Sequence, residues 1–419
     1  MSIEPRVPMD ERSSDVAPRP RSLWRNRDYL LLWSGQAFSD IGGSVSELAY
    51  PLLVLAITRA PAQAGFVAAL RAAPAVLISL LAGVLVDRWN RRWVMVVCDI
   101  GRAVCLASIP VAYALGHLTI WQLYVTALSE GALTVVFNLA KTAAVTQVVE
   151  REQLTAAVAR EELVEGTTAL CGPPLSGALY TAGALLPFLA DALSYAVSIV
   201  TLALIRAPFQ PERSAGRRRI WSEMTEGVRW VARQPFILTM TLLMGAGTLV
   251  LSSESLVIII LAERQRAGAF VIGLIIAVSG IGAILGSLLA PRLKRRLSVG
   301  HSILLARWYF ALSWPLYALF PVAPMLGALQ FGTGVIDPIE DVPYFSHRLE
   351  LIPDELKGRV LSACRMFPGT IRPLGLALTG VLIQRFGIFP TIWLQCLWLF
   401  VTAGIVTLIP YVRRERAVS

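Results

Sequence analysis

The sequence carries little charge for its length. Charged residues make up 16% of the 419 residues, against about 25% in a typical soluble domain, and 55% are hydrophobic. The apolar residues fall in long blocks rather than at amphipathic spacing. A soluble globule of this size could not keep so much apolar surface away from water. The composition therefore excludes an ordinary soluble domain and predicts a membrane protein.

Motifs of several enzyme and cofactor classes are also missing. The three histidines (His117, His301 and His347) are scattered, and the five cysteines lie in apolar segments without CxxC spacing. No GxxxxGK[ST] run occurs, which argues against an ATP-driven pump on this chain. We expect no metal, no other cofactor and no enzymatic activity. A polytopic membrane enzyme is the least supported alternative, because no His/Asp pair or metal spacing supplies its chemistry.

Twelve apolar stretches are long enough to cross a bilayer as helices, which takes about 20 residues each. They lie at 29–57, 62–86, 93–115, 120–140, 163–185, 187–206, 235–261, 270–291, 302–320, 323–346, 361–384 and 388–411. The net charge of +10 would suit a nucleic-acid binder, but 29 of the 38 lysines and arginines fall on the side shared by both termini. Positive charge in short loops stays in the cytoplasm. We therefore expect both termini there, and no nucleic-acid partner.

These spans predict an all-α membrane protein of twelve helices in two six-helix bundles. No apolar signal sequence precedes the first span, and 208–234 carries an amphipathic helix that would lie along the membrane interface. The expected segments are a disordered cytoplasmic tail (1–23), an N-terminal bundle (24–207), a cytoplasmic linker (208–234), a C-terminal bundle (235–411) and a cytoplasmic tail (412–419).

The two halves resemble each other at an offset of roughly 200 residues. Gly83 to Arg92, between spans two and three, matches Gly286 to Arg296, between spans eight and nine. Gly172-Pro173-Pro174-Leu175-Ser176-Gly177 in span five pairs with Arg372-Pro373-Leu374-Gly375 in span eleven. Repeated halves are typical of alternating-access transporters, whose binding site lies near the midplane between them.

Nearly the whole chain resembles the major facilitator superfamily. The motif G-x-x-x-D-R-x-x-R-R/K of that superfamily is matched by Gly83, Asp87, Arg88, Arg91 and Arg92. The segment Gly172, Pro173, Gly177 resembles the span-five motif of proton-coupled exporters, with Ser176 in place of one glycine. The opening Leu23 to Tyr29 and the loop Ile352 to Val360 resemble the bacterial branch of macrolide and siderophore (enterobactin-type) exporters.

The resemblance implies that spans one, four, seven and ten line a central cavity. Helical projection at 100° per residue places polar side chains on one face of spans one, four and ten, and Glu254 lies off the threonine stripe of span seven. The residues expected to line the substrate and proton cavity are Gln36, Asp40, Glu47, Glu130, Thr134, Glu254, Asp337, Asp341 and Tyr344. Intramembrane acids usually face a bundle interior or a wet cavity. The alternative is that several are structural, hydrogen-bonded across helices or paired with Lys141.

The motifs have separate expected roles. Asp87 and its arginines would gate the cytoplasmic mouth by meeting the N-terminus of span eleven. The alternative is that the arginines only anchor the loop on the cytoplasmic side. The Gly172–Pro173 segment would kink span five. Asp99 and Arg102 would neutralise each other, and Arg372 would pair structurally or bind an anion.

Together these features predict a secondary transporter in the bacterial inner membrane that exports small amphipathic molecules by proton antiport. The drug, siderophore or secondary metabolite that it carries does not follow from the sequence. The partners would be the substrate, protons and the lipid bilayer, and a monomer would suffice because the cavity forms within one chain. The alternative is an importer of a polar metabolite with the same fold.

We predict that Asp87→Asn slows transport while membrane insertion stays intact, because the amide removes the charge that would meet the helix N-terminus. Transport rate and the amount of protein in the membrane are measured side by side. Unchanged rates would remove the gating role.

Overall fold

The computed structural model describes residues 23–78, 86, 89–150, 153–206 and 220–410, which are helical, without a strand among them. The first half contains η1 (Leu23–Arg25), α1 (Arg27–Thr58), α2 (Pro61–Ala72), α3 (Pro74–Leu77), α5 (Arg91–Ala114), α6 (Ile120–Val148), α7 (Leu154–Ala182) and α8 (Leu186–Leu204). The second half contains α9 (Ile220–Arg233), α10 (Pro235–Leu251), α11 (Glu254–Arg264), α12 (Ala269–Lys294), α13 (Val299–Leu319), α14 (Ala323–Leu351), η3 (Asp354–Leu356), α15 (Lys357–Phe386) and α16 (Ile388–Leu408).

Local sequence signals set the helix ends. Asn26 caps α1, because its side chain accepts the backbone N–H of Tyr29 at 3.1 Å. The same side chain donates to the carbonyl of Val148 at 2.7 Å, which ties the start of α1 to the end of α6. Proline begins α2 and α10, where its missing N–H costs nothing. Gly387, with a φ of 88°, makes the turn between α15 and α16.

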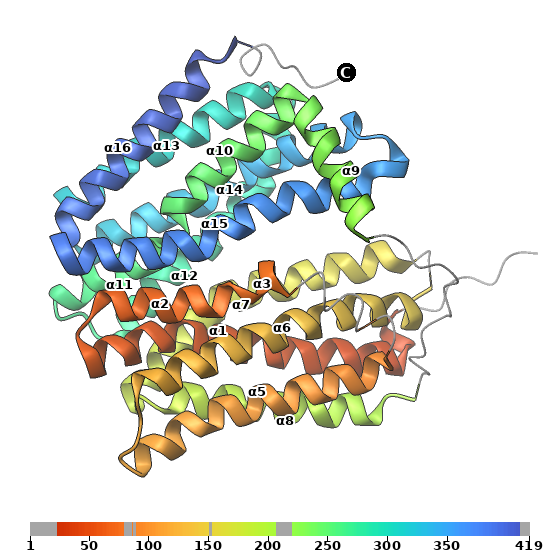
Figure 1. Ribbon diagram of the computed structural model, residues 1–419, viewed down its shortest axis with the longest axis vertical. Coiled ribbons are helices and arrows are strands. Elements are labelled where there is room, and N and C mark those ends of the chain that lie inside the picture. The colour runs from red at the N-terminus through yellow and green to blue at the C-terminus, as the bar shows by residue number, and fades with distance from the viewer. Residues whose placement is uncertain (1–22, 79–85, 87–88, 151–152, 207–219, 411–419) are drawn as a thin grey trace, which may run out of the picture.

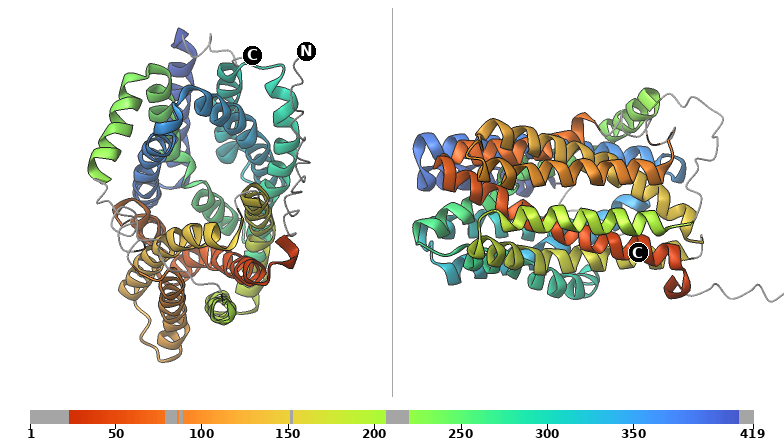
Figure 2. Two further views of the ribbon diagram at one scale, coloured as in Figure 1. Left: turned by 90° about the vertical axis from the view of Figure 1, so that its right-hand side faces the viewer. Right: turned by 90° about the horizontal axis from the view of Figure 1, so that it is seen from below.

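The helices before residue 207 lie together, and those after residue 219 lie beside them (Figure 1). The end view in Figure 2 shows the two groups of helices one above the other. The contacts between the groups are made mainly by α7 with α12 and by α2 with α15. Each of these contacts joins one helix of the first half to one helix of the second.

Glycines bring these helices into backbone contact. A Cβ at Gly273 on α12 would lie 2.2 Å from the carbonyl oxygen of Pro173 on α7, and one at Gly177 would lie 2.2 Å from that of Ala269. Between α2 and α15, a Cβ at Gly65 would lie 2.6 Å from the carbonyl oxygen of Leu376. Small residues let membrane helices approach this closely. The Gly172–Pro173 motif therefore serves packing: α7 continues through it, and the predicted kink stays a prediction.

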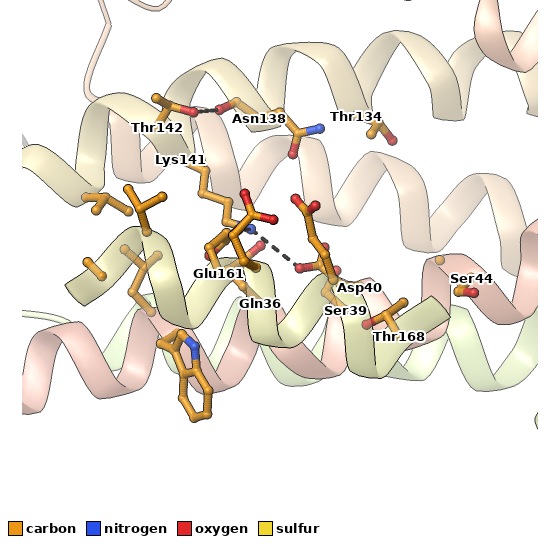
Figure 3. Close-up of a pocket in the computed structure, with 18 of the residues that line it drawn as sticks. Gln36, Ser39, Asp40, Ser44, Thr134, Asn138, Lys141, Thr142, Glu161 and Thr168 are labelled. Carbon is orange, nitrogen blue, oxygen red and sulfur yellow. Dashed lines mark hydrogen bonds and ion pairs between the residues drawn. The ribbon is translucent and has the colours of Figure 1, made fainter. Parts of the chain in front are cut away.

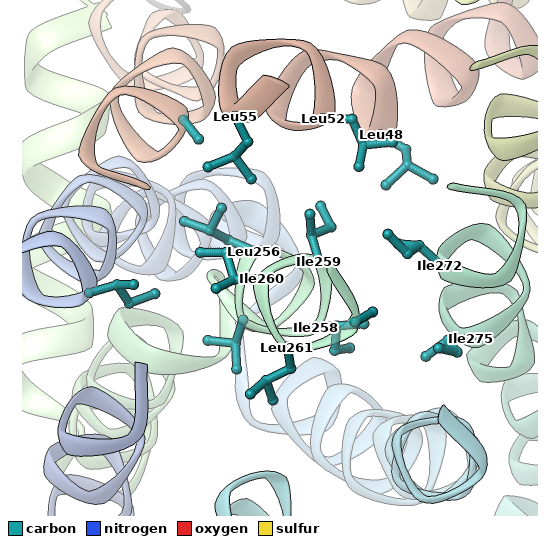
Figure 4. Close-up of a cluster of buried hydrophobic side chains, with 14 of the residues drawn as sticks. Leu48, Leu52, Leu55, Leu256, Ile258, Ile259, Ile260, Leu261, Ile272 and Ile275 are labelled. Atoms are coloured by element: carbon teal, nitrogen blue, oxygen red, sulfur yellow. The ribbon is translucent and has the colours of Figure 1, made fainter. Parts of the chain in front are cut away.

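An apolar cluster fills one end of the space between the halves. Leu48, Leu52 and Leu55 of α1 face α11 and α12 across it (Figure 4). The residues facing them are Leu256, Ile258, Ile259, Ile260, Leu261, Ile272 and Ile275. These side chains are 9% exposed or less. The end of the molecule at which α1 finishes, called the closed end below, is therefore filled mainly by apolar side chains.

Eight helices in the described part of the chain are long and apolar enough to cross a membrane. They are Arg27–Thr58, Arg91–Ala114, Ile120–Val148, Leu186–Leu204, Pro235–Arg264, Ala269–Lys294, Asp354–Phe386 and Ile388–Leu408. Four expected spans are not among them: 62–86, where part of the stretch lies outside the described residues, and those in α7, α13 and α14. Helices α7, α13 and α14 carry charges, such as Glu161, Arg307 and Glu340, that lower their hydropathy.

The span expected over 235–261 is present but interrupted. α10 ends at Leu251 and α11 starts at Glu254. At the break, the hydroxyl of Ser253 lies 2.8 Å from that of Thr379, which accepts the Gln395 side-chain amide at 3.0 Å. These side chains hold the interruption against α15 and α16. Interrupted helices are tolerated in membrane proteins where they are buried or line a cavity.

The amphipathic segment of the linker forms α9, which packs on α15. Arg359 of α15 pairs with Glu226 of α9, with 2.5 Å between Nη1 and Oε2. The predicted tails and the first part of the linker lie outside the described residues.

We predict that Gly273→Val lowers the free energy of unfolding by about 1–3 kcal/mol, the usual cost of overpacking. Gly404→Val is the matched control, because it makes the same change in a helix where no atom lies within 4 Å of the new Cβ. Thermal unfolding midpoints in detergent compare the two. Equal midpoints would contradict the close contact between α7 and α12.

Candidate functional site

A cavity of about 750 Å³ opens among the helices of the first half. Its walls come from α1, α6 and α7, with Arg71 from α2, Arg102 from α5 and Tyr195 from α8. It extends from Tyr29, at the start of α1, to Glu47, directly before the apolar cluster. The cavity thus occupies the end opposite to the closed end.

The expected residues divide between this cavity and the second half. The structure places five of them in the wall: Gln36, Asp40, Glu47, Glu130 and Thr134. Glu254, Asp337, Asp341 and Tyr344 are not in the wall and lie on α11 and α14. The wall comes mainly from α1, α6 and α7, which correspond to the expected spans one, four and five. The resemblance implied spans one, four, seven and ten, and spans seven and ten contribute no residue to this wall.

A buried ion pair forms the inner wall. Arg71 donates to Glu130, with 2.8 Å between Nη2 and Oε1 and 3.2 Å from Nε to either carboxylate oxygen. The same guanidinium donates to the carbonyl of Gly43 at 3.3 Å. The Glu130 side chain is 1% exposed, so the bidentate contact provides its charge neutralisation.

A second ion pair lies nearer the open end. Lys141 of α6 lies between Asp40 of α1 and Glu161 of α7 (Figure 3). Its Nζ is 3.4 Å from Asp40 Oδ2 and closer to Glu161. The lysine is 11% exposed and the two acids about a third, so the acids reach the cavity. One cation thus holds three helices together, and its partners stay accessible to solvent and ligand.

The expected pairing of Asp99 with Arg102 is present. Asp99 is fully buried, is ion-paired with Arg102 and accepts the hydroxyl of Ser198 at 2.7 Å. Ser198 in turn accepts the side-chain amide of Gln36 at 3.0 Å. The pair thereby connects through α8 to a residue of the cavity wall.

The second half carries a separate polar cluster. Glu254, at the start of α11, accepts the hydroxyl of Tyr317 at 2.6 Å and that of Thr333 at 3.4 Å. Asp337 and Asp341 of α14 are exposed, and Tyr344 is buried in an apolar cluster.

The buried acid Glu340 on the same helix is paired with Arg307 of α13. Glu254 is bonded to hydroxyls, whereas Glu130 and Glu340 are bonded to guanidinium groups. Each half thus has a buried glutamate paired with an arginine, and the second half also has Glu254 bonded to hydroxyls.

Several wall residues were missed from the sequence. Glu161, Glu162 and Glu165 lie on α7, which begins at Leu154, nine residues before the expected span. Because the extra turns carry charge, hydropathy placed Glu161 and Glu162 outside the helix. Glu165 lay within the expected span 163–185 and was assigned no role. Arg71 was assigned no role, although an arginine inside an apolar stretch is itself a signal.

The gating motif is described in part. Gly83, Asp87 and Arg88 lie outside the described residues. Arg91 donates to the carbonyl of Ala143 at 2.9 Å, and Arg92 to that of Ile205 at 2.8 Å. These two arginines tie the start of α5 to α6 and to the end of α8.

We predict that Glu130→Gln lowers the free energy of unfolding by up to about 3 kcal/mol, because Arg71 loses its buried counter-charge. The double variant Glu130→Gln/Arg71→Met should recover part of this loss. Thermal unfolding in detergent gives both values. A double variant that is less stable than the single one would contradict the pairing.

Comparison with known proteins places the chain in a family. YfiS of Bacillus subtilis, named as an uncharacterized MFS-type transporter, is 26% identical over 408 residues, covering 93% of this chain and 94% of that protein. The multidrug efflux pump Tap of Mycolicibacterium fortuitum is 24% identical over 395 residues, covering 92% and 96%.

Solved structures share the fold. The nucleoside transporter NupG superposes with a TM-score of 0.72 at 14% identity, covering 91% of this chain and 98% of that one. A bacterial homologue of the iron transporter ferroportin gives 0.72 in its inward-facing state at 15% identity, covering 92% and 99%. The same homologue gives 0.58 in its outward-facing state, at 14% identity and covering 90% and 98%.

The family profile described as transmembrane secretion effector matches residues 19–417. Since the match covers almost the whole sequence, the chain belongs to this family of major facilitator superfamily transporters.

Proposed function

We propose that the protein is a proton-coupled exporter of small amphipathic molecules across the bacterial inner membrane. The observation that carries this proposal is the charged cavity of about 750 Å³, which lies opposite to an apolar closed end. A cavity accessible from one side and sealed on the other is one of the two states that alternating access requires.

The proposal includes twelve membrane helices in two six-helix bundles, separated by the linker at 208–234. The bundles are 24–207 and 235–411, and α10 with α11 counts as one interrupted span. The four spans that hydropathy alone does not identify carry charge or lie partly outside the described residues. Burial against neighbouring helices makes such charged spans possible in a bilayer.

The proposed orientation places the cavity toward the cytoplasm. The lysine and arginine distribution puts both termini there. α1 begins and α6 ends on the cavity side, whereas the closed end carries the sparsely charged loops. The higher TM-score to the inward-facing state of the ferroportin homologue, 0.72 against 0.58, supports the same assignment.

The proposed substrate is amphipathic because the wall is mixed. Leu32, Trp33, Val145 and Val158 supply apolar surface. Thr134, Asn138, Thr142 and Thr168 supply hydrogen-bonding groups. Sites that bind small molecules combine such apolar walls with few polar groups.

Protons are the proposed driving ion. An acid bonded to a guanidinium stays ionised, whereas one that meets hydroxyls or is unpaired can accept a proton when it is desolvated. Glu254 has hydroxyl partners, and Asp40 shares Lys141 with Glu161. One charge moved through 100 mV is worth about 2.3 kcal/mol, which makes a proton a useful driver.

We predict that cells expressing the protein accumulate less of at least one compound from a panel of dyes and antibiotics. The effect should vanish with an uncoupler and in the Asp40→Asn variant. Cellular fluorescence or drug content measures it, with an empty vector as control. Accumulation that rises with expression would indicate uptake, and five amide variants (at Asp40, Glu47, Glu130, Asp337 and Asp341) that all export normally would exclude coupling through these acids.

A further inference from the structure

One ion pair joins the two halves of the molecule within the described residues. Glu47 of α1 lies between two guanidinium groups: its Oε1 is 3.8 Å from Arg372 Nη2 on α15, and its Oε2 is 3.9 Å from Arg71 Nη1 on α2. The other ion pairs in which both partners are described lie within one half. Glu47 is therefore an electrostatic tie between the halves.

The tie lies where the closed end meets the cavity. Glu47 lines the cavity and directly precedes Leu48, the first α1 residue of the apolar cluster. Arg372 is one turn before Leu376, whose carbonyl packs against Gly65 of α2. α1 and α15 must separate here if the closed end is to open, so the tie opposes that movement.

The tie is also accessible and loose. The side chain of Glu47 is 60% exposed and that of Arg372 is 57% exposed. Arg71 is already engaged by Glu130 at 2.8 Å, which leaves its contact with Glu47 beyond hydrogen-bond distance. A carboxylate with two distant cations can exchange one of them for a ligand at little cost.

The cavity around this carboxylate favours cations. Six acids line it (Asp40, Glu47, Glu130, Glu161, Glu162 and Glu165), against three bases (Arg71, Arg102 and Lys141), although the whole chain has a net charge of +10. A cavity with an excess of one sign raises the local concentration of opposite charges.

We propose that an organic cation binds Glu47 by displacing Arg372 and that this exchange releases the tie between the halves. The proposal rests on the proposed function and names its substrate class: an amphipathic molecule with a positive charge. The empty carrier is held with the closed end shut, and the loaded carrier is free to open it.

A proton on Glu47 would release the tie in the same way. The charged and titratable groups on the neighbouring helices include Arg71 on α2, Glu130 on α6, Glu165 on α7, Asp191 and Tyr195 on α8, and Arg372 on α15. Because one carboxylate cannot hold both a proton and the cation, the two ligands exclude each other. This exclusion is what antiport requires.

Cross-linking across the closed end tests the tie. Ala62 and Gln384 meet there, with 3.1 Å between the Ala62 nitrogen and Gln384 Oε1. Ala62→Cys/Gln384→Cys is introduced into a variant in which alanine replaces the five native cysteines. A short thiol cross-linker is then applied to this protein in proteoliposomes.

We expect tetraphenylphosphonium to lower the cross-linking yield of the Ala62→Cys/Gln384→Cys protein that carries no further substitution. Arg372→Gln and Glu47→Gln should each lower it without ligand by up to about fivefold, the range of an exposed ion pair. Their double variant should be no lower than either single variant, and the ligand should add nothing.

Arg365→Gln is the matched control, because it removes an exposed arginine two turns earlier on α15.

A second readout leaves the native cysteines in place: Arg372→Gln should raise the substrate-free proton leak of proteoliposomes several-fold, since the empty carrier can then cycle. Wild-type cross-linking in both single variants, or strictly additive effects, would overturn the tie. A ligand effect of equal size in Arg372→Gln and the unchanged protein would overturn the exchange. If the variants behave as expected but nothing is exported from cells, the tie stands and the exporter proposal falls.

Discussion

The structure depends on how ionised side chains are neutralised inside a helical protein surrounded by apolar surface. Glu130 meets Arg71 and Glu340 meets Arg307 between neighbouring helices, and Asp99 meets Arg102 within α5, so that none of these helices carries the charge unpaired. Breaking such a pair is costly, whereas a pair in place contributes little net stability. The two pairs between helices therefore fix helix positions, whereas the cavity acids Asp40, Glu47 and Glu161 are more exposed.

The two ends of the molecule follow from this division. At one end, apolar side chains and glycine contacts close the space between the halves. At the other end, acids on α1, α6 and α7 line the cavity of the first half. Separating the halves at the closed end would expose leucine and isoleucine side chains to water, at a free-energy cost of about 25 cal/mol per Å² of apolar surface.

The sequence predicted helical class, the repeat between halves and the polar faces of spans one and four, because long apolar blocks and helical periodicity are local signals. It did not predict the break at Ser252–Ser253, which tertiary hydrogen bonds hold, nor the acids of α7, whose charge hid the start of that helix. Arg372 was expected to pair structurally or to bind an anion, but its partner in the other half, Glu47, could be identified only from the three-dimensional structure.

The central claim is that protons and substrate move in opposite directions through one cavity. Its most direct measurement imposes a tetraphenylphosphonium gradient on proteoliposomes that contain a pH-sensitive dye and no other ion gradient. The account predicts proton movement against the direction of the cation, in proportion to protein and absent from empty liposomes. Cation flux without proton movement, or with protons moving in the same direction, would contradict it.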